Sequence, residues 1–435
     1  MATMLSRRRF LQRAGLAAAA ASFSPRYAQA ALKKISANEK IHVASIGVGG
    51  MGRSHFDRLL KNDEVRLIAA SDPDAQRQQA AKEKAAESGQ EVATYTHFPE
   101  MLDAHPDIDA VFVATPDHWH ALATIACLRA GKDVYCEKPL ALTLAEGRAM
   151  VEHARRFGRV VQMGTMQRSD QAQFRHACEL VHNGRIGTLQ KVVCFFGDNP
   201  RSEYVPDEEP PAYLDWDFWL GPAPWRRFNK MIHPYNFRYF RDYSGGMLTD
   251  WGVHLFDIAQ WGAGKDHTSP RRIESESRMY QENLYEYPQV CRVRYDYGDV
   301  VFEWQQGTPE VAEIEHGENY GTKFYGTEGE VFVNRGGYAA RDNKGNAINE
   351  VVGPNDIHLY ASASHHGDFF QAMHTRKPPI CDVEIGHRAT AISHLGNISL
   401  RVGRSLEYDP DKEFFPNDPA ANKMIAKPMR APWRL

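Results

Sequence analysis

A glycine-rich turn between an apolar run and an amphipathic run constrains the fold of this chain most strongly. Residues 41–47 (IHVASIG) are apolar and rich in β-branched side chains, as in a buried strand, and residues 54–62 (SHFDRLLKN) have helical spacing. Between them, GVGGMG places glycines at 47, 49 and 52, which fits the pattern G-x-G-x-x-G. A strand, a tight turn and a helix in this order predict the first unit of a doubly wound parallel sheet.

The same alternation continues to residue 164. Further strands are predicted at 65–71, 109–115, 133–139 and 159–164, and helices between them at 75–88, 120–131 and 144–156. Gly131 is expected to close the helix at 120–131. The pattern predicts a Rossmann domain over 31–164, after a leader at 1–30 that we leave out of the fold.

Beyond residue 164 the pattern changes to paired strands. Residues 189–197, 290–306 and 322–336 alternate apolar and polar side chains, and helices are predicted at 171–183, 366–376 and 385–403. We therefore predict an α/β protein whose second domain, 165–404, is of the α+β kind with an open, mostly antiparallel sheet. Its C-terminal helices are expected to pack back on the Rossmann domain, and 405–435 to form a tail.

The first 30 residues carry the features of an export signal. Three arginines at 7–9 precede a short apolar stretch at 16–21, and 28–30 (AQA) has the pattern of a cleavage site. The run SRRRFL at 6–11 resembles a twin-arginine signal, whose partner is the twin-arginine export machinery. A general basic amino terminus or a transit peptide is the alternative. The apolar stretch is shorter than the roughly 20 residues of a membrane span, so we expect a periplasmic or otherwise exported protein without stable membrane insertion.

Charge and cysteine content exclude several classes of protein. A net charge of −3 and an isoelectric point near 6.7 provide no basic surface for nucleic acid and no polybasic patch for a membrane. The six cysteines form no C-x-x-C pair, so buried thiols are expected rather than a disulfide framework.

The glycine loop is the first candidate binding site. Gly47 can make the tight turn, Gly49 can let the backbone approach a pyrophosphate, and Gly52 can allow close packing of helix on strand. The N–H groups at the start of the following helix, with Gly50 and Met51, would then face the phosphates. The loop is predicted to bind a dinucleotide, and the alternative is an ordinary glycine-rich turn.

An acidic residue at the end of the next strand refines this prediction. Asp72 stands twenty residues beyond Gly52, where its carboxylate can accept a hydrogen bond from a ribose 2′-hydroxyl and would repel a 2′-phosphate. We therefore predict NAD rather than NADP as the cofactor, although Ser71 and Arg77 nearby can weaken that preference. A solvated Asp-Pro turn is the alternative.

Four markers in a fixed order resemble the Gfo/Idh/MocA family, named after glucose–fructose oxidoreductase, inositol dehydrogenase and a rhizopine-catabolism protein. The markers are the glycine loop, Ala114-Thr115-Pro116 with His120, Glu137-Lys138-Pro139, and Gly245-Gly246 followed by Asp250-x-x-x-His254. The resemblance extends over about residues 41–403. It implies an NAD(P)-dependent oxidoreductase acting on CH–OH groups of sugars or polyols, and a homo-oligomer, dimer or tetramer, that pairs through the open face of the second sheet.

The resemblance also implies which residues bind and react. Thr115, Pro116, His120, Glu137 and Lys138 are expected beside the cofactor. Predicted substrate contacts are weaker and comprise Gln167, Arg168, Tyr235, Asn236 and Arg238. Trp216, Trp219 and Trp225 can stack on sugar faces or pack in the interior, and the pair His365-His366 is expected to face solvent or cap a helix.

Lys138, Asp250 and His254 are the predicted catalytic residues. Lys138 follows a parallel strand at the edge where ligands of such sheets bind, and Pro139 fixes its backbone through a peptide that is often cis in the family. Asp250 and His254 share a face if a helix begins near Asp250, and histidine suits the removal of a hydroxyl proton. A lysine in a surface turn, and an N-cap aspartate beside a core histidine, are the alternatives. No metal is predicted, because no further ligand has matching spacing.

These features together predict hydride transfer at a carbohydrate or polyol hydroxyl. An exported enzyme meets no abundant free nicotinamide pool, so we expect tightly bound NAD that is recycled in place. One alternative is an NAD-dependent glycoside hydrolase that works by oxidation, elimination, hydration and reduction, although the segment around His254 lacks the His-Gly-rich pattern of that branch. The other is a non-catalytic binding protein that kept the fold.

Overall fold

The N-terminal domain is built on a parallel sheet. The structure, a computed structural model, describes residues 39–197, 200–279, 283–307 and 319–435, so the predicted leader lies outside the described residues. In these residues the first sheet has the strand order β3-β2-β1-β4-β5-β6, and every pair in it is parallel. Its elements are β1 (Ile41–Ile46), α2 (Gly50–Leu60), β2 (Val65–Ser71), α3 (Ala75–Glu87), β3 (Ala93–Tyr95), α4 (Phe98–Ala104), β4 (Ala110–Val113), α5 (Asp117–Arg129), β5 (Asp133–Cys136), α6 (Leu144–Phe157) and β6 (Val161–Met163).

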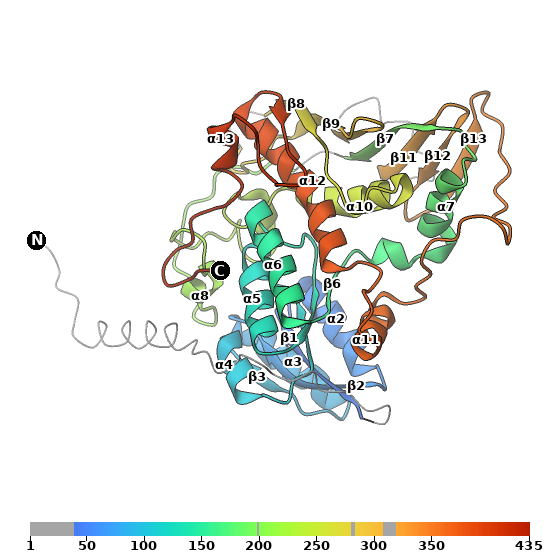
Figure 1. Ribbon diagram of the computed structural model, residues 1–435. Coiled ribbons are helices and arrows are strands. Elements are labelled where there is room, and N and C mark those ends of the chain that lie inside the picture. Colours follow the sequence, from blue (N-terminus) through green and yellow to red (C-terminus); the bar gives the residue numbers. More distant parts are fainter. Residues whose placement is uncertain (1–38, 198–199, 280–282, 308–318) are drawn as a thin grey trace, which may run out of the picture.

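Both faces of this sheet are covered, and successive residues of each strand point to opposite faces. In β4, Val111 and Val113 belong to the core that contains α4, α5 and α6, whereas Ala110 and Phe112 belong to the core that contains α2 and α3. Figure 1 shows α5 and α6 side by side on one face of the sheet. Strands buried on both sides explain why their sequences are mainly apolar rather than strictly alternating.

The C-terminal domain contains the second, larger sheet. Within the described residues its order is β13-β12-β11-β7-β10-β9-β8-β14, and only the pair β7–β10 is parallel. Its strands are β7 (Leu189–Phe196), β8 (Arg272–Arg278), β9 (Val290–Asp296), β10 (Val301–Gln306), β11 (Tyr320–Gly326), β12 (Gly329–Val333), β13 (Tyr338–Asp342) and β14 (Leu406–Glu407). The helices outside the first domain are η2 (Met166–Ser169), η3 (Gln171–Arg175), α7 (His176–His182), α8 (Trp216–Leu220), η4 (Asn236–Tyr239), α9 (Met247–Asp250), α10 (Gly252–Ala263), α11 (His365–Thr375), α12 (Val383–Val402) and α13 (Pro419–Asn422).

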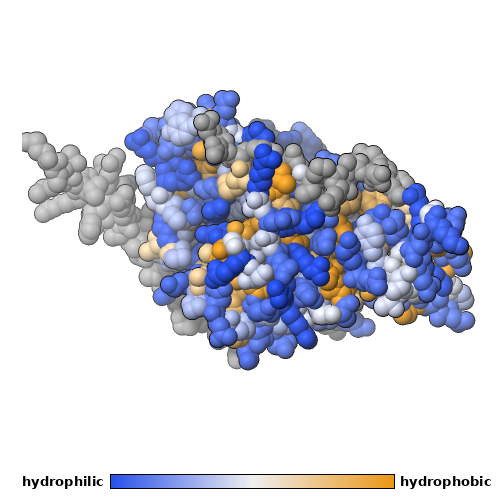
Figure 2. Space-filling model, turned by 90° about the horizontal axis from the view of Figure 1, so that it is seen from above, coloured by the Kyte–Doolittle hydropathy of each residue, from blue (hydrophilic) through white to orange (hydrophobic). Residues whose placement is uncertain are grey.

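One face of the second sheet packs on helices and the other faces away from them. Val192 and Cys194 of β7 join the main core with α7 and α10, while their neighbours Val193 and Phe195 form a small apolar cluster with Phe332 on the opposite face. Figure 2 views the molecule from this side and shows apolar side chains interspersed among hydrophilic ones. The predicted fold class, a Rossmann domain followed by an α+β domain with a mostly antiparallel sheet, is confirmed.

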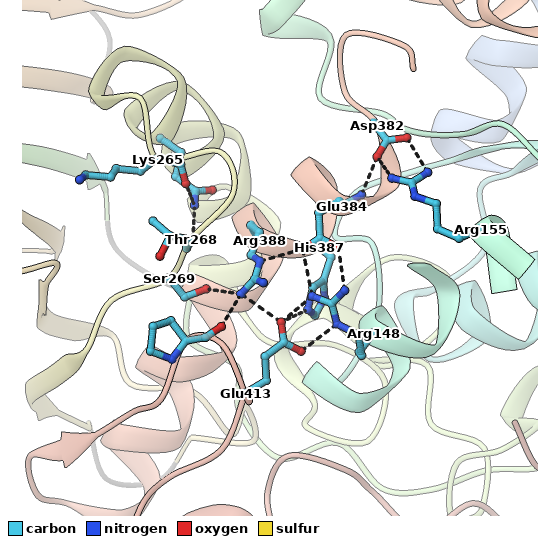
Figure 3. A network of polar contacts seen from close by, with 12 residues as sticks. Arg148, Arg155, Lys265, Thr268, Ser269, Asp382, Glu384, His387, Arg388 and Glu413 are labelled. Carbon is cyan, nitrogen blue, oxygen red and sulfur yellow. Dashed lines mark hydrogen bonds and ion pairs between the residues drawn. The ribbon is translucent and has the colours of Figure 1, made fainter. Parts of the chain in front are cut away.

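The last helices of the chain pack against the first domain. Phe369, Phe370 and Met373 of α11 complete the core beneath β1 and β4. Helix α12 packs along α6, and Figure 3 shows the polar network that joins them. In it Arg148 of α6 donates hydrogen bonds to both carboxylate oxygens of Glu384 at 2.7 and 3.0 Å, and to both of Glu413 in the tail at 3.0 and 2.6 Å.

Two further features bear on the sequence predictions. All six cysteines lie in the described part of the chain, where they are buried and unpaired, as expected. Gly131, at φ 76°, follows Ala130, the residue that caps α5. No helix among the described residues is both long and apolar enough to cross a membrane.

Candidate active site

The predicted site residues converge on one cavity of about 630 Å³ between the two domains. Its floor is formed where β1, β2, β4 and β5 end, and its roof by residues of α9, α10 and the segment before them. Strands β1 and β4 are neighbours in the sheet, although the chain runs outward from β1 to β2 before it returns to β4. The cavity therefore lies at the crevice where ligands bind in doubly wound sheets.

The glycines of the loop add no side chains of their own to the cavity wall, which Met51 and the Arg77 guanidinium, lying against Gly49, also line. Gly47 has φ 83°, and a Cβ there would lie 2.6 Å from the carbonyl oxygen of Ala114. Helix α2 begins at Gly50 with no acidic residue in its first turn, so its N-terminal N–H groups face the cavity without a competing carboxylate. Gly52 does not line the cavity; it is needed because a Cβ there would lie 2.0 Å from the Gly47 carbonyl oxygen. This bare loop fits a pyrophosphate.

Asp72 stands at the end of β2, on the wall of the same cavity. Its carboxylate is buried and accepts hydrogen bonds from the backbone N–H groups of Val48 and Asp74, both at 3.0 Å. The Arg77 guanidinium lies 3.8 Å from Asp72 and 3.6 Å from Asp74. Burial raises the pKa of the Asp72 carboxyl, which the charge of Arg77 and the two N–H groups offset in part.

Lys138 links the two domains across the cavity. It follows β5, the Lys138–Pro139 peptide is cis, and its ammonium donates hydrogen bonds to Asp250 Oδ1 at 2.6 Å and to the Asp250 carbonyl oxygen at 2.7 Å. Arg238 approaches the other carboxylate oxygen of Asp250 at 3.4 Å. Burial would raise the pKa of Asp250, but the charges of Lys138 and Arg238 lower it to about 2. The carboxylate is thus ionised, and each of its oxygens faces a cation.

His254 stands beside this group in a neutral form. Asp250 ends α9, and His254 lies in the first turn of α10, which begins at Gly252, so the predicted continuous helix is interrupted between them. Burial, followed by the charges of Lys138 and Arg335, holds the pKa of His254 well below 6.5. Its Nδ1 has no hydrogen-bond partner among the described residues. A neutral imidazole with a free nitrogen can accept a proton.

Two other buried polar groups on the cavity wall lack partners. The Thr115 hydroxyl and both amide atoms of Gln167 make no hydrogen bond within the described part of the chain, although Gln167 is only 5% exposed. Buried polar atoms normally have partners. A wall with such unpaired polar groups beside a glycine loop suits a polar ligand with several hydrogen-bonding groups.

Comparison with known proteins supports this assignment. Residues 41–165 match the NAD-binding Rossmann fold, and residues 196–435 the C-terminal alpha/beta domain, of one oxidoreductase family. The chain belongs to the Gfo/Idh/MocA family. Among curated relatives, myo-inositol 2-dehydrogenase of Thermotoga maritima is 25% identical over 382 residues, 85% of this chain and 99% of the relative. The scyllo-inositol 2-dehydrogenase (NAD(+)) of Bacillus subtilis is 26% identical over 304 residues, 68% of this chain and 74% of the relative.

Solved structures share the family fold at lower identity. Levoglucosan dehydrogenase in complex with NADH and L-sorbose superposes with a TM-score of 0.63 at 19% identity, covering 85% of this chain and 99% of its own. Aldose-aldose oxidoreductase from Caulobacter crescentus in complex with glycerol gives 0.62 at 20% identity, covering 85% of this chain and 100% of its own. The chain is thus an oxidoreductase with the NAD-binding domain of its family.

Most of the residues singled out by the family resemblance line the cavity. They are Gly47, Gly49, Gly50, Met51, Asp72, Thr115, Pro116, Glu137, Lys138, Gln167, Tyr235, Arg238, Asp250 and His254. His120 does not: it is buried behind the wall, where its two ring nitrogens contact the carbonyl oxygens of Pro139 at 2.7 Å and Thr115 at 2.9 Å. His120 therefore connects, from behind the cavity wall, the family motif that contains Thr115 with the one that contains Pro139.

The substrate prediction needs two corrections. Arg168 is 1% exposed and does not line the cavity, because its guanidinium donates hydrogen bonds to Asp257 at 2.8 Å and to Asp266 at 2.6 and 3.0 Å. Arg168 thus forms ion pairs with Asp257 and Asp266 inside the second domain. Asn236 also lies outside the cavity wall, whereas its neighbours Tyr235 and Arg238 line it.

Several other residues of the site or its surroundings were missed or misjudged. Trp251 and Arg335 line the cavity, with the guanidinium 4.8 Å above the indole ring, and no spacing in the sequence pointed to either. Of the three tryptophans considered for sugar stacking, Trp219 lines the cavity, Trp216 is buried against it at 4.7 Å, and Trp225 is 64% exposed. The prediction for the paired histidines was wrong for His365, which is buried and contacts the Met163 carbonyl oxygen.

Proposed function

We propose that the protein transfers hydride at a hydroxyl-bearing carbon of a sugar or polyol, with NAD held in the cavity. The observation that carries this is the convergence of Lys138, Asp250 and His254 with the glycine loop and Asp72 around one cavity. When bound, NAD supplies the hydride acceptor or donor. Many polar groups around one cavity suit a substrate with many hydroxyls, because each hydroxyl needs a partner.

The side chains divide the remaining work. Oxidation of an alcohol to a ketone removes a hydride from carbon and a proton from oxygen. His254 is neutral and has a free nitrogen, so it can accept that proton. The Lys138 ammonium stabilises the negative charge that develops on the same oxygen. Asp250 keeps the ammonium in place and has a second oxygen, near Arg238, that can accept a bond from a neighbouring hydroxyl.

Substitution of the two reacting groups tests this function. Lys138→Met and His254→Gln should each reduce kcat/KM by about 10²- to 10⁴-fold while the protein stays folded and still binds NAD. Lys61→Met, at an exposed position, is the matched control for the lysine. A ketone product formed with equivalent reduction of NAD or of a second substrate supports the oxidoreductase. Release of nitrophenol from nitrophenyl glycosides without net reduction would instead identify a hydrolase.

We further propose that NAD stays bound through catalytic cycles and that the protein is exported by the twin-arginine route. The run at 6–11 supports export, and an enzyme outside the cytoplasm needs to carry its own nucleotide. Denaturing the purified mature protein should release about one nucleotide per chain, which chromatography identifies. An empty, active protein would contradict retention. Lysine replacement of both Arg7 and Arg8 should leave the protein in the cytoplasmic fraction.

A homo-oligomer is also proposed, by pairing through the outer face of the second sheet. The support is the apolar cluster of Val193, Phe195 and Phe332 on that face, with Tyr325 packed against it. Light scattering should give the mass of a dimer or tetramer, and Tyr325→Glu should lower it. A monomeric wild-type protein would contradict the proposal.

A further inference from the structure

A chain of three side chains runs from the cavity into the core of the first domain. Glu137 lines the cavity at the end of β5, and its Oε1 lies 2.7 Å from Nε2 of His55 in α2. Nδ1 of His55 lies 2.9 Å from Nε2 of His366 in α11. His55 is 1% exposed and Glu137 is 5% exposed. Three segments far apart in sequence thus meet behind the cavity wall, where α2 and α11 lie together in Figure 1.

The chemistry of the three groups fixes the direction of the hydrogen bond to Glu137, and that of the hydrogen bond to His366 when His55 is neutral. A carboxylate only accepts, so Nε2 of His55 carries the hydrogen that it donates to Glu137. Nδ1 of a neutral His55 is then an acceptor, and Nε2 of His366 must donate to it. Burial, above all, lowers the pKa of His366 to about 3, so this ring is neutral and can donate from Nε2. His366 therefore selects the one tautomer of His55 that can donate to Glu137.

The surroundings leave these groups little freedom to move. The His55 ring packs edge-on against Tyr135 at 5.2 Å and lies 5.7 Å from Phe112. The His366 ring packs edge-on against the same two rings, each at 5.1 Å. On the other side, a Cβ at Gly164 would lie 2.5 Å from Glu137 Oε1, so only glycine leaves room for the carboxylate. Rings locked by packing hold a functional group more accurately than solvated side chains do.

We propose that His55 is a positioning residue and His366 fixes its tautomer, so that together they hold the Glu137 carboxylate ionised on the wall of the cofactor cavity. The proposal rests on the proposed function, because it concerns the NAD that this function requires. The oxidised nicotinamide ring carries a positive charge that the reduced ring lacks. An ionised carboxylate on the cavity wall therefore favours the oxidised form over the reduced form.

The charges around Glu137 predict what loss of His55 would do. Burial would raise the pKa of Glu137, but the hydrogen bond from His55, the largest of the opposing influences, together with the charge of Lys138, lowers it to about 2. The remaining neighbours are the Tyr135 phenol, the two histidines of α11 and the Arg58 guanidinium. With Lys138 also committed to Asp250, the carboxyl without His55 would bind a proton more tightly, by about ten-fold or more.

The test measures binding of the two nucleotide forms, not turnover. The ratio of dissociation constants of NAD⁺ and NADH is determined from pH 5 to 9 by NADH fluorescence and competition. In His55→Leu, Glu137 should become protonated toward the acid end, so NAD⁺ should weaken relative to NADH by about ten-fold there and recover as the pH rises. His374→Leu, at an exposed position on the same helix as His366, is the matched control and should follow the wild type.

Two variants at His366 separate positioning from packing. His366→Leu removes the donor to His55 and should change the ratio in the same direction as His55→Leu, though less. His366→Gln keeps an N–H donor and should restore most of the wild-type behaviour. A folded His55→Leu protein whose ratio and pH profile match those of His374→Leu would overturn the proposal. If His55→Leu does not fold, equal effects of the leucine and glutamine variants at 366 would overturn it. A wild-type protein that binds neither nucleotide refutes the proposed function instead.

Discussion

Replacement of Asp72 by serine should convert the nucleotide preference of this protein. The carboxylate lies where β2 ends on the cavity wall, and the Arg77 guanidinium is 3.8 Å from it. In Asp72→Ser the negative charge that would repel a 2′-phosphate is removed. The same change releases Arg77 from one of its two carboxylate partners, Asp74 being the other. Both effects favour NADP, and the loss of the carboxylate acceptor disfavours NAD.

The size of each effect follows from the geometry. A 2′-phosphate as close to Asp72 as the Arg77 guanidinium is, at 3.8 Å, would be repelled by about 4 kcal/mol at an effective dielectric constant of about 20. Repulsion of that order on a 2′-phosphate corresponds to roughly a thousand-fold in affinity, which sets the upper limit of the gain for NADP. A hydrogen bond to a charged acceptor contributes about 1.5–3 kcal/mol, so NAD should bind about ten- to a hundred-fold more weakly.

Equilibrium dialysis against labelled NAD and NADP measures both affinities, given enough time for bound nucleotide to exchange. The double variant Asp72→Ser/Arg77→Met is the control, because it removes the repulsion without leaving a free guanidinium, and its gain for NADP should be smaller. A ratio of NAD to NADP affinity that changes less than about three-fold in Asp72→Ser, in a folded protein, would refute the placement of the ribose at Asp72.

Three further predictions concern buried charges. Arg168→Met should lower the free energy of unfolding by about 3–5 kcal/mol in urea titrations, because it leaves the fully buried Asp257 unpaired. A change in KM alone, at wild-type stability, would show instead that Arg168 binds substrate. Burial alone would raise the pKa of Glu384, but Arg148 lowers it from 4.5 to about 2. The stability from this pair should therefore be complete above pH 4.5 and be lost as the pH falls toward 2. Arg148→Met should flatten the acid-unfolding curve measured by circular dichroism over that range, and an unchanged curve would contradict the role of the pair. Burial alone would lower the pKa of His120, but Cys136, Asp117 and the Pro139 carbonyl raise it to about 10. The stabilisation from the His120 charge should therefore be fully present below pH 6.5 and be lost as the pH rises through 10. Nitrogen NMR at pH 8 should show a doubly protonated ring for His120 and a neutral one for His118, and a neutral His120 would refute this.

Much of the fold could be predicted because the elements are long and periodic. Strand β2 and helix α12 show their burial patterns within a single stretch of sequence. Strand β3 and helix α4 were not predicted, since three and seven residues are too few for a period to show. The parallel pairing of β7 with β10 was not foreseen either. The pairing arises because β7 and β10 lie next to each other between β11 and β9 in the sheet, and no local sequence pattern indicates this order.

The site could be predicted where chemistry and strand position coincide, as at Asp72 and Lys138. It could not be predicted where a side chain is claimed by a distant partner. The sequence gives no reason to treat Arg168 differently from Gln167 beside it as a substrate contact. Only the fold reveals that the Arg168 guanidinium donates to aspartates about 90 residues away. His55 and His366 are 311 residues apart, so their contact has no local signal.

Helix α11 also affects the order in which the protein can be completed during synthesis. Phe369, Phe370 and Met373 fill the core of the first domain against Phe112, yet they are made after nearly all of the second domain. The core of the first domain therefore lacks these side chains until residue 373 has been made, long after its own last strand. The export leader proposed at 1–30 would be made first and would wait until that core is complete. Such a chain suits an export route that accepts proteins only after folding, because its N-terminal domain is completed by a helix near its C-terminus.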